Sequence, residues 1–439
     1  MPDWEKYYDE HLITLEQAAE KINSGDKIFF GQTITISYPF LDLLYKREDL
    51  TDVGIYYNCS SGMFDMVFDA DSKKRFHIMT MFSSPLDRMS GSMGICDFNS
   101  NPYEYFTRSI IDEYGCNTMV VEICPPDENG RCNLGVLGIP SNGLFNADPH
   151  VVKKIGIINH DCAFPAQGDY EEVTIPLTDF DYIVINDHEP SVLPVSAPTE
   201  VDKIIASYIL PYIKEGDSIQ VGMGGLGEQI TAELKNKSNI NIFTEIAVDS
   251  MVELAEAGIL NSITACGAFG TTKIFDFLAK SDKVKMKPVS YMLEPPFISQ
   301  VDNLVGINQT LMVDLLGQAC SEAQGLKMYS GVGGSFGFIY GITKSKGGRS
   351  FLCLRSTYTD KEGKVRSNVV PWLPEGSIVT TPKYLVMYLV SENGIADVFL
   401  KTNRDRIKAI MKIAHPDFLP ELKEKIISTG QIAEEDFDS

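Results

Sequence analysis

The sequence predicts an α/β protein made of two tandem open α/β domains with largely parallel sheets. Three observations lead to this prediction: a length of 439 residues, a helix–strand unit that occurs twice, and an alternation of helical and strand-like segments. A chain of this length exceeds one ordinary hydrophobic core, so two domains are the default expectation. A content of 44% hydrophobic and 22% charged residues is typical of a globular protein.

A unit of helix, Gly-Asp, strand and glycine occurs twice, about 190 residues apart. The first copy spans 14–31 and the second spans 199–222. Each copy begins with a threonine suited to cap a helix, with Gln17 or Asp202 three residues after it. Each helix is expected to end at a glycine, and a short apolar strand follows. Gly-Asp before a strand is common, so the pattern predicts a duplication but leaves chance similarity open.

Helical and strand-like segments also alternate outside the repeat. The β-branched apolar runs at 118–123 and 182–185 predict strands, whereas 226–235 and 250–257 have the apolar spacing of helices. Gly258 is expected to end the second of these helices. The alternation predicts open, largely parallel sheets, and ligands of such sheets bind beyond the carboxyl ends of the strands.

The segment 187–198 is the expected linker between the two domains. It carries three prolines, which disfavour helix and suit an extended connection. We place the boundary near residue 195. The N-terminal domain is then residues 1–195, and the C-terminal domain, which carries the candidate nucleophile, is residues 196–439.

The formal net charge of −22 limits the classes of partner. A chain this acidic repels nucleic-acid phosphates and anionic membranes, so neither is expected as a partner. A small anionic ligand needs a local site that is basic or rich in free N–H groups. The sequence therefore directs attention to segments that differ from the acidic bulk of the chain.

The cysteines and the N-terminus indicate a cytoplasmic protein. The nine cysteines are odd in number and include no Cys-x-x-Cys pair, which favours a reducing compartment over a disulfide framework. The first ten residues are charged and lack the apolar stretch of a signal peptide. No apolar run approaches the roughly 18 residues that a membrane-spanning helix requires.

The first candidate functional feature is Gly222-Met-Gly-Gly225, between a strand expected at 219–221 and a helix that begins at Leu226. Glycines at such a turn let the backbone present N–H groups at a helix N-terminus, where negative charge is favoured. Taken alone, the pattern fits a purely structural turn as well.

The second candidate is Glu245, which directly follows a strand expected at 240–244. A carboxylate after a buried strand lies at the edge where parallel sheets bind ligands. Position alone favours more ordinary explanations, either an acid at a helix N-terminus or a solvated loop.

The third candidate is the glycine loop Tyr329-Ser-Gly-Val-Gly-Gly334, followed by the basic cluster Lys344-Ser-Lys-Gly-Gly-Arg349. Glycine N–H groups beside lysines suit phosphates or an oxyanion. A solvent-exposed Lys/Gly turn explains the cluster equally well. The six histidines show no metal-binding spacing, so no metal site is predicted.

Taken in order along nearly the whole chain, these segments resemble the family I coenzyme A transferases. The similarity is to the group of 4-hydroxybutyrate, butyrate:acetate and itaconate CoA-transferases and acetyl-CoA hydrolase/transferases. The motifs that carry the resemblance are Pro125-Pro-Asp-Glu-Asn-Gly130, Glu200-Val-Asp202, Gly222-Met-Gly-Gly225, Thr244-Glu245, Asp302-Asn303, Val313-Asp-Leu315 with Gly317-Gln318, Tyr329-Ser-Gly-Val-Gly-Gly334, Pro374-Glu-Gly-Ser-Ile-Val-Thr-Thr-Pro382 and Ile413-Ala-His-Pro-Asp-Phe418.

The resemblance implies a ping-pong CoA-transferase with Glu245 as the nucleophile. Coenzyme A is then a substrate, carried from acetyl-CoA or another short acyl-CoA to an acid such as butyrate, 4-hydroxybutyrate or itaconate. The implied intermediates are an acyl-glutamyl anhydride and a glutamyl-CoA thioester. No metal takes part, and a homodimer or larger homo-oligomer is expected by analogy.

The resemblance also implies roles for the residues around Glu245. Backbone N–H groups at Met223 and Gly334 would stabilise the oxyanion, with the side chains of Asn303, Gln220 and Gln32 bordering the substrate. The residues implied to bind CoA are Gly222, Gly224, Gly225, Gly331, Gly333, Lys344 and Lys346.

The chain departs from the family pattern at three places. The family commonly has Gly-Gly-Gln-x-Asp-Phe-x-Arg-Gly after the second glycine loop, so Gly337 stands where an acid is usual and Tyr340 where a basic residue is usual. Leu226-Gly227 replaces the usual Ile-Pro. The segment 31–37 differs from the usual His- and Gly-rich stretch, which faces the acyl group. The glutamate and both glycine loops are retained.

Two other functions remain open at the level of sequence. An acyl-CoA hydrolase needs the same glutamate but admits water to the intermediate, and no residue pattern separates it from a transferase. A non-catalytic acyl-CoA binding protein would be marked by loss of the nucleophile, whereas Glu245 is present.

Overall fold

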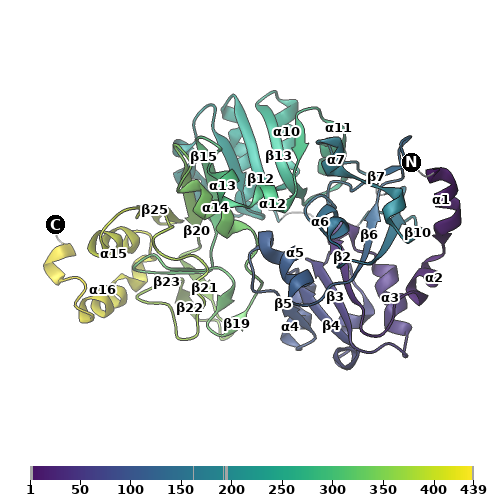
Figure 1. The fold of residues 1–439 in the computed structure, drawn as a ribbon. Coiled ribbons are helices and arrows are strands. Elements are labelled where there is room, and N and C mark those ends of the chain that lie inside the picture. The colour runs from purple at the N-terminus through teal and green to yellow at the C-terminus, as the bar shows by residue number, and fades with distance from the viewer. Residues whose placement is uncertain (1–2, 162, 191, 193–195, 438–439) are drawn as a thin grey trace.

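The computed structural model describes residues 3–161, 163–190, 192 and 196–437, and it contains two eight-stranded sheets (Figure 1). All strands of the first sheet pair in parallel. Their spatial order is β1 (Leu12–Ile13), β10 (Tyr182–Ile185), β8 (Lys153–Ile158), β6 (Thr118–Ile123), β2 (Lys27–Gln32), β3 (Val53–Asn58), β4 (Phe76–Thr80) and β5 (Cys96–Phe98).

The second sheet is parallel except for one edge strand, which pairs antiparallel with its neighbour. Its spatial order is β14 (Val284–Met286), β13 (Leu260–Ala268), β12 (Ile240–Ala247), β11 (Ser218–Val221), β15 (Leu304–Gln309), β20 (Arg349–Cys353), β24 (Tyr388–Ser391) and β25 (Gly394–Asp397). The prediction of two open α/β units with largely parallel sheets is confirmed.

The two sheets share one strand order when the second is read from its opposite edge. In the first sheet β2 lies between β6 and β3, and β4 and β5 follow. In the second sheet β11 lies between β15 and β12, and β13 and β14 follow. The strands of the sequence repeat, β2 and β11, therefore occupy equivalent central positions.

Both helices of the repeat begin as predicted. Thr14 caps α2 (Leu15–Glu20) and Thr199 caps α8 (Glu200–Ile209), and each cap is a reciprocal capping box. The expected helix ends are wrong, because both helices finish several residues before the glycine. Gly25 and Gly216, with φ of 89° and 81°, instead form the turns that lead into the strands.

Most other sequence-based elements are also confirmed. The strands β6 and β10 have the predicted bounds, and the two predicted helices are α9 (Gly225–Glu233) and α10 (Ser250–Glu256). One strand is longer than expected: β12 continues to Ala247, so Glu245 lies inside the strand rather than after it. The boundary near residue 195 falls outside the described residues, and the division into 1–195 and 196–439 stays a prediction.

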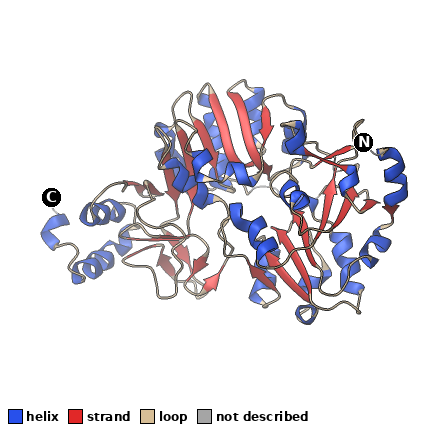
Figure 2. Ribbon diagram, in the orientation of Figure 1, coloured by secondary structure: helices blue, strands red, loops and turns tan. Residues whose placement is uncertain are grey.

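Helices flank both sheets (Figure 2). In the first half these are α1 (Trp4–His11), α3 (Tyr38–Lys46), α4 (Pro85–Ser92), α5 (Tyr103–Asp112), α6 (Asn142–Ala147) and α7 (Tyr170–Val173). In the second half they include α11 (Thr272–Lys280), α12 (Val289–Met292), α13 (Pro295–Ile298) and α14 (Ser335–Ile342), whereas α15 (Asn403–Met411) and α16 (Leu419–Ser428) belong to a separate lobe. Among the described helices, none is long and apolar enough to cross a membrane.

Beside β20 and β24 lies a lobe that the sequence did not predict, drawn in green and yellow in Figure 1. It has its own cluster of buried residues, which continues into Leu352 of β20 and Leu389 of β24. The lobe contains α15, α16 and three small sheets. Their strands are β16 (Met312–Asp314), β17 (Ala319–Cys320) and β23 (Val369–Val370), β18 (Ala323–Gln324) and β19 (Lys327–Met328), and β21 (Thr357–Thr359) and β22 (Val365–Ser367). A further pair, β7 (Arg131–Asn133) and β9 (Thr174–Pro176), belongs to the first half.

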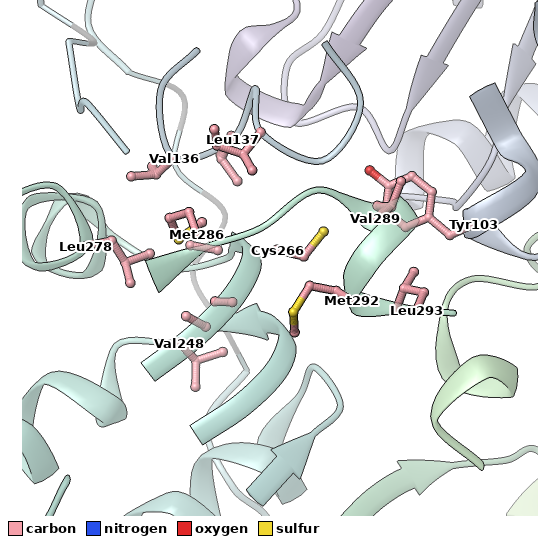
Figure 3. Packing of buried hydrophobic residues seen from close by; sticks show 14 of the residues in the cluster. Tyr103, Val136, Leu137, Val248, Cys266, Leu278, Met286, Val289, Met292 and Leu293 are labelled. Atoms are coloured by element: carbon pink, nitrogen blue, oxygen red, sulfur yellow. The ribbon is translucent and has the colours of Figure 1, made fainter. Parts of the chain in front are cut away.

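One cluster of buried hydrophobic residues continues from the first half into the second. Figure 3 shows Tyr103 and Leu137 of the first half packed in the same cluster as Cys266, Met286 and Met292 of the second. Burial of this apolar surface is the main force that holds the two halves together. The shared core fixes how the two sheets meet, and the candidate site lies at that junction.

Candidate active site

A cavity of about 520 Å³ lies between the carboxyl ends of the central strands of the two sheets. The first half contributes Gln32 and Asn58, which end β2 and β3. The second half contributes Gln220 of β11 and Glu245 of β12. Parallel sheets hold ligands at this edge, and a cavity of this size accommodates a small organic ligand.

The Glu245 carboxylate is half-buried in this cavity. On the neighbouring strand β13 it lies level with Cys266, because Thr244 pairs with Ala265 and Ile246 with Gly267. Burial raises the pKa of Glu245 to about 7, and repulsion from the Glu104 carboxylate adds a smaller increase. No hydrogen bond or ion pair joins the Glu245 carboxylate to a residue that the structure describes. A poorly solvated, unpaired carboxylate of this kind is a good nucleophile once ionised.

The glycine loop 331–334 lies against the Glu245 carboxylate. A Cβ atom on Gly334 would overlap Oε2 of Glu245 and would come within 2.9 Å of Cδ1 of Leu293. The N–H groups of residues 331–334 donate no hydrogen bond to any residue within the described ranges. Free N–H groups beside a carboxylate can stabilise an oxyanion that forms when this carboxylate attacks a carbonyl group.

The same loop is held by contacts with the first half of the chain. Tyr103 N–H donates to the Gly333 carbonyl at 3.1 Å, and Ser83 Oγ–H donates to the Tyr329 carbonyl at 2.6 Å. A Cβ atom on Gly331 would approach the Asn99 carbonyl oxygen at 2.6 Å. Glycine is therefore required at this position, because the first half approaches the backbone closely.

The first glycine turn contributes Gly222 and Met223 to the cavity. Gln309 Nε2 donates to the Met223 carbonyl at 3.0 Å, while the Met223 N–H has no acceptor in the part of the chain that is described. Gly224 has φ of 111° and so needs to be glycine, but neither it nor Gly225 lines the cavity. A Cβ atom on Gly225 would lie 3.0 Å from the Asp202 carboxylate, so its role is to let the helices pack.

Two pairs of buried amides line opposite sides of the cavity. Gln220 and Asn308 exchange hydrogen bonds of 2.9 Å and 3.2 Å. Asn58 Nδ2 donates to Gln32 Oε1 at 3.2 Å, and the Tyr103 hydroxyl donates to the same oxygen. Asn58, Asn308 and Tyr103 were not predicted from the sequence. The detectable signal was an asparagine at or near the end of an apolar strand, since Asn58 is the last residue of β3 and Asn308 the penultimate residue of β15.

Three predicted site residues lie away from Glu245: Asn303, Lys344 and Lys346. Ser218 pairs with both Leu304 of β15 and Asn241 of β12, so Asn303 lies at the amino end of the sheet. Glu245 lies about 16 Å further along the strand direction, at roughly 3.3 Å per residue. Lys346 is beside Asn303, since its carbonyl accepts from Asn303 N–H at 2.8 Å.

The two lysines lie far from Glu245 because of the helix α14, which was not predicted from the sequence. It begins directly after the glycine loop and runs back along the sheet, so that the basic cluster that follows lies at the amino end of β20. A Cβ atom on Gly337 of α14 would overlap the Leu293 carbonyl oxygen. The acid that is usual there would not fit, so this departure has a packing reason. The same holds for Gly227, where a Cβ atom would overlap the Gly222 carbonyl oxygen.

Arg355 is the one Lys or Arg among the described residues that line the cavity. Its Nη2 donates to Thr199 Oγ1 at 3.2 Å and lies 3.9 Å from the Asp202 carboxylate, and 55% of its side chain is exposed. Arg355 and Gln309 are the exposed residues among those that line the cavity, and Thr357 and Tyr358 beside Arg355 are half-buried, so we take this as the open side of the cavity.

The thiols near Glu245 are poor alternative nucleophiles. Burial raises the pKa of Cys59, which lines the cavity, and of Cys266, beside Glu245, well above the ordinary thiol value. Both thiols therefore stay protonated near neutral pH, and the thiolate is the reactive form of cysteine. In the described ranges, no group of three or more His, Cys, Asp or Glu side chains is arranged to hold a metal ion.

Comparison with known proteins links this geometry to a chemistry. The family described as acetyl-CoA hydrolase/transferase C-terminal domain matches residues 270–426. The chain is 30% identical to 4-hydroxybutyrate coenzyme A transferase of Clostridium kluyveri, an alignment that covers 95% of this chain and 97% of that one. It is 32% identical to succinyl-CoA:cyclohexane-1-carboxylate CoA transferase of Geobacter metallireducens, with 96% of each chain covered.

Similarity extends to a hydrolase and to solved structures. An acetyl-CoA hydrolase of Neurospora crassa is 26% identical over 53% of this chain and 46% of its own length. The crystal structure of RipA from Yersinia pestis superimposes with a TM-score of 0.88, at 26% identity, over 98% of this chain and 100% of that chain. A similarity that covers nearly the whole chain includes both sheets and the cavity between them.

Proposed function

Because this chain belongs to the family of coenzyme A transferases, we propose that it moves coenzyme A from a short acyl-CoA to a small carboxylic acid through a glutamyl thioester on Glu245. The observation that carries the proposal is the half-buried Glu245 carboxylate, unpaired among the described residues, in a cavity beside the free N–H groups of the loop 331–334.

In the first step the ionised Glu245 carboxylate attacks the thioester carbonyl of the acyl-CoA. A bond forms between a glutamate oxygen and the acyl carbon, the carbon–sulfur bond breaks, and CoA leaves as the thiolate. The product is an acyl-glutamyl anhydride. Negative charge develops on the carbonyl oxygen during the attack, and the N–H groups of Gly334 and Met223 stabilise it in the proposed mechanism.

In the second step the CoA thiolate attacks the side-chain carbonyl carbon of Glu245. The anhydride bond breaks, the donor acid leaves as its carboxylate, and a glutamyl-CoA thioester remains. An acceptor carboxylate then reverses both steps and leaves as the new acyl-CoA. The long CoA chain stays bound in part during the exchange, and its binding free energy can be used at the reacting centre.

Loading the enzyme with acetyl-CoA in the absence of an acceptor acid tests this mechanism. Hydroxylamine or borohydride added after loading is expected to modify Glu245 alone, and peptide mass spectrometry detects the change. Full turnover with Glu245 unmodified would refute the proposal.

The rate is expected to fall as the pH drops below about 7, because only ionised Glu245 attacks the thioester and its pKa is raised to about 7. Glu104→Gln removes a neighbouring negative charge, so the acid limb of kcat/KM should move to lower pH. The midpoint of the acid limb should still lie above the ordinary pKa range of a glutamate, because burial is the larger cause of the raised pKa of Glu245. Initial rates between about pH 5 and pH 9 measure both effects. An acid limb that moves to higher pH in the variant, or that does not move, would contradict this electrostatic coupling between Glu104 and Glu245.

Arg355 is expected to hold the CoA phosphates in place of the predicted lysines, because it is the cation at the open side of the cavity. Arg355→Ala should raise KM for the acyl-CoA about tenfold with little change in kcat. A matched control is Lys346→Ala, at the opposite edge of the sheet, which should leave KM unaltered. Equal effects of both substitutions, measured by initial-rate kinetics, would count against this placement of the phosphates.

Hydrolysis of acyl-CoA is the second candidate function, since a relative of this chain carries the name acetyl-CoA hydrolase. The same glutamyl intermediate would then react with water. Release of free CoA with and without an acceptor acid separates the two reactions. Turnover that depends on the acid supports the transferase, and equal turnover without it supports the hydrolase.

A further inference from the structure

Two polar atoms in the cavity wall are buried and have no hydrogen-bond partner in the described chain: Thr33 Oγ1 and Asn58 Oδ1. Thr33 is 2% exposed and Asn58 is 8% exposed, and both line the cavity. A buried polar group without a partner is costly, and such groups are few in folded proteins. Two of them at the closed end of one cavity indicate that a ligand supplies the missing hydrogen bonds.

The Asn58 amide has its nitrogen directed toward Gln32. Asn58 Nδ2 donates to Gln32 Oε1, which also accepts from the Tyr103 hydroxyl. The Asn58 oxygen is therefore the free atom, and it can only accept a hydrogen bond. The Thr33 hydroxyl, in contrast, can donate, and rotation about one side-chain bond directs it.

The backbone at this end of the cavity is strained as well. Thr33 and Cys59 have φ of 46° and 54°, a conformation that side chains with a Cβ rarely adopt, and Thr33 N–H donates to the Cys59 carbonyl at 3.2 Å. Retained strain of this kind is concentrated at functional sites.

The second copy of the internal repeat has a glycine at the position that corresponds to Thr33. Thr33 is the counterpart of Gly224, because each is the second residue after the glycine that ends the repeat. Gly224 adopts a positive φ without steric strain because it has no Cβ atom, whereas Thr33 adopts one with strain. The first half keeps a costly side chain where the second half has glycine, which points to a use for the Thr33 hydroxyl.

The closed end of the cavity is where the acyl chain belongs. The CoA chain must leave through the open side near Arg355, so the acyl group extends from Glu245 in the opposite direction, toward the first half. Gln32 of that half approaches the strand beside Glu245, since its Nε2 lies 3.4 Å from a Cβ position on Gly267. The acyl chain therefore reaches the group formed by Thr33, Asn58 and Gln32.

We infer that Thr33 and Asn58 recognise a hydroxyl group on the acyl chain, so that the acid this enzyme handles is a short hydroxy acid. The inference rests on the proposed function and adds the substrate class. One hydroxyl satisfies both atoms, since it donates to Asn58 Oδ1 and accepts from the Thr33 hydroxyl. An alkyl chain would leave both unpaired. A second carboxylate would face an acceptor oxygen, and no lysine or arginine within the described residues lines this end.

Acceptor acids that differ in one hydroxyl test this inference, with acetyl-CoA as the donor. The kcat/KM for 4-hydroxybutyrate should exceed that for butyrate by at least about tenfold, and succinate should be poorer than either. Thr33→Val keeps the shape but removes the hydroxyl, so the ratio should fall toward one, mainly through loss of the hydroxy acid. Thr33→Ser should preserve the ratio. Asn58→Leu should also lower it, which provides a second test if one variant fails to fold.

Thr359→Val is the matched control, because Thr359 is exposed and lies outside the lining of the cavity, and the ratio should stay at the wild-type value. A wild-type ratio near or below one, or a ratio unaffected by both Thr33→Val and Asn58→Leu, would overturn the inference. Formation of the Glu245 thioester from acetyl-CoA is measured in the same preparations. Its absence in the wild type refutes the proposed function itself, whereas its presence with no hydroxyl preference refutes the substrate class alone.

Discussion

Glu245→Gln is expected to lower kcat/KM by at least about 10⁴-fold while the protein stays folded. Glutamine has nearly the shape of glutamate, so the loop 331–334 and the strand β12 should keep their packing. The amide is neutral and a poor nucleophile, so neither the anhydride nor the thioester can form. Steady-state kinetics measure the loss, and circular dichroism checks the fold.

A matched control for this substitution is Glu256→Gln, an exposed glutamate at the end of α10. It should leave kcat/KM within about twofold, because a surface charge far from the cavity contributes little. Mass spectrometry after loading with acetyl-CoA should find the thioester in the control and not in Glu245→Gln. Residual activity above about one per cent in Glu245→Gln, with purity confirmed, would mean that another group is the nucleophile.

Gly334→Ala is expected to lower kcat by about 10²-fold or more, with a much smaller effect on KM. The added methyl group would overlap the Glu245 carboxylate and crowd Leu293, so either the glutamate or the loop must move. A displacement of about 1 Å separates the carboxylate from the N–H groups that stabilise the transition state. Steady-state kinetics with acetyl-CoA give kcat and KM separately.

Gly143→Ala provides the control for this second substitution. Gly143 lies in the helix α6, and a Cβ atom there would meet only Leu134 Cδ1, at 3.4 Å. Its activity should match the wild type, since alanine is also favoured over glycine in a helix. If Gly334→Ala kept the wild-type kcat, the loop would not be in tight contact with the nucleophile, and the assignment of the Gly334 N–H as an oxyanion donor would be withdrawn.

The architecture followed from local features of the sequence. Thr14 and Thr199 mark two helix starts, and the apolar runs at 118–123 and 182–185 mark two buried strands, with the bounds that the structure has. Caps and apolar runs depend on residues a few positions apart, so they can be recognised without knowledge of the fold. Glu245 was recognised through the resemblance to a family, since its position alone favoured an ordinary surface acid.

Two lysines that were predicted to bind CoA lie away from Glu245. Lys344 and Lys346 follow the glycine loop closely in sequence, and this proximity suggested that they bind the same ligand. The helix α14 lies between the glycine loop and these lysines and runs back along the sheet. The lysines therefore lie at the opposite edge of the sheet. The apolar sequence of α14, with Gly337 and Gly341, gave no clear helical signal, because those glycines are required by packing against Leu293 and Ile298.

The sequence by itself determined the two largely parallel sheets and the capped helices of the repeat and, with the family resemblance, predicted Glu245 as the nucleophile. Only the tertiary structure decided which residues share a cavity with that glutamate: Asn58 and Thr33 from the first half, and Asn308 and Arg355 from the second. These residues are far apart in sequence and meet because a shared hydrophobic core holds the carboxyl ends of the two sheets together. Contacts between distant segments depend on how whole layers pack, and no pattern of neighbouring residues encodes them.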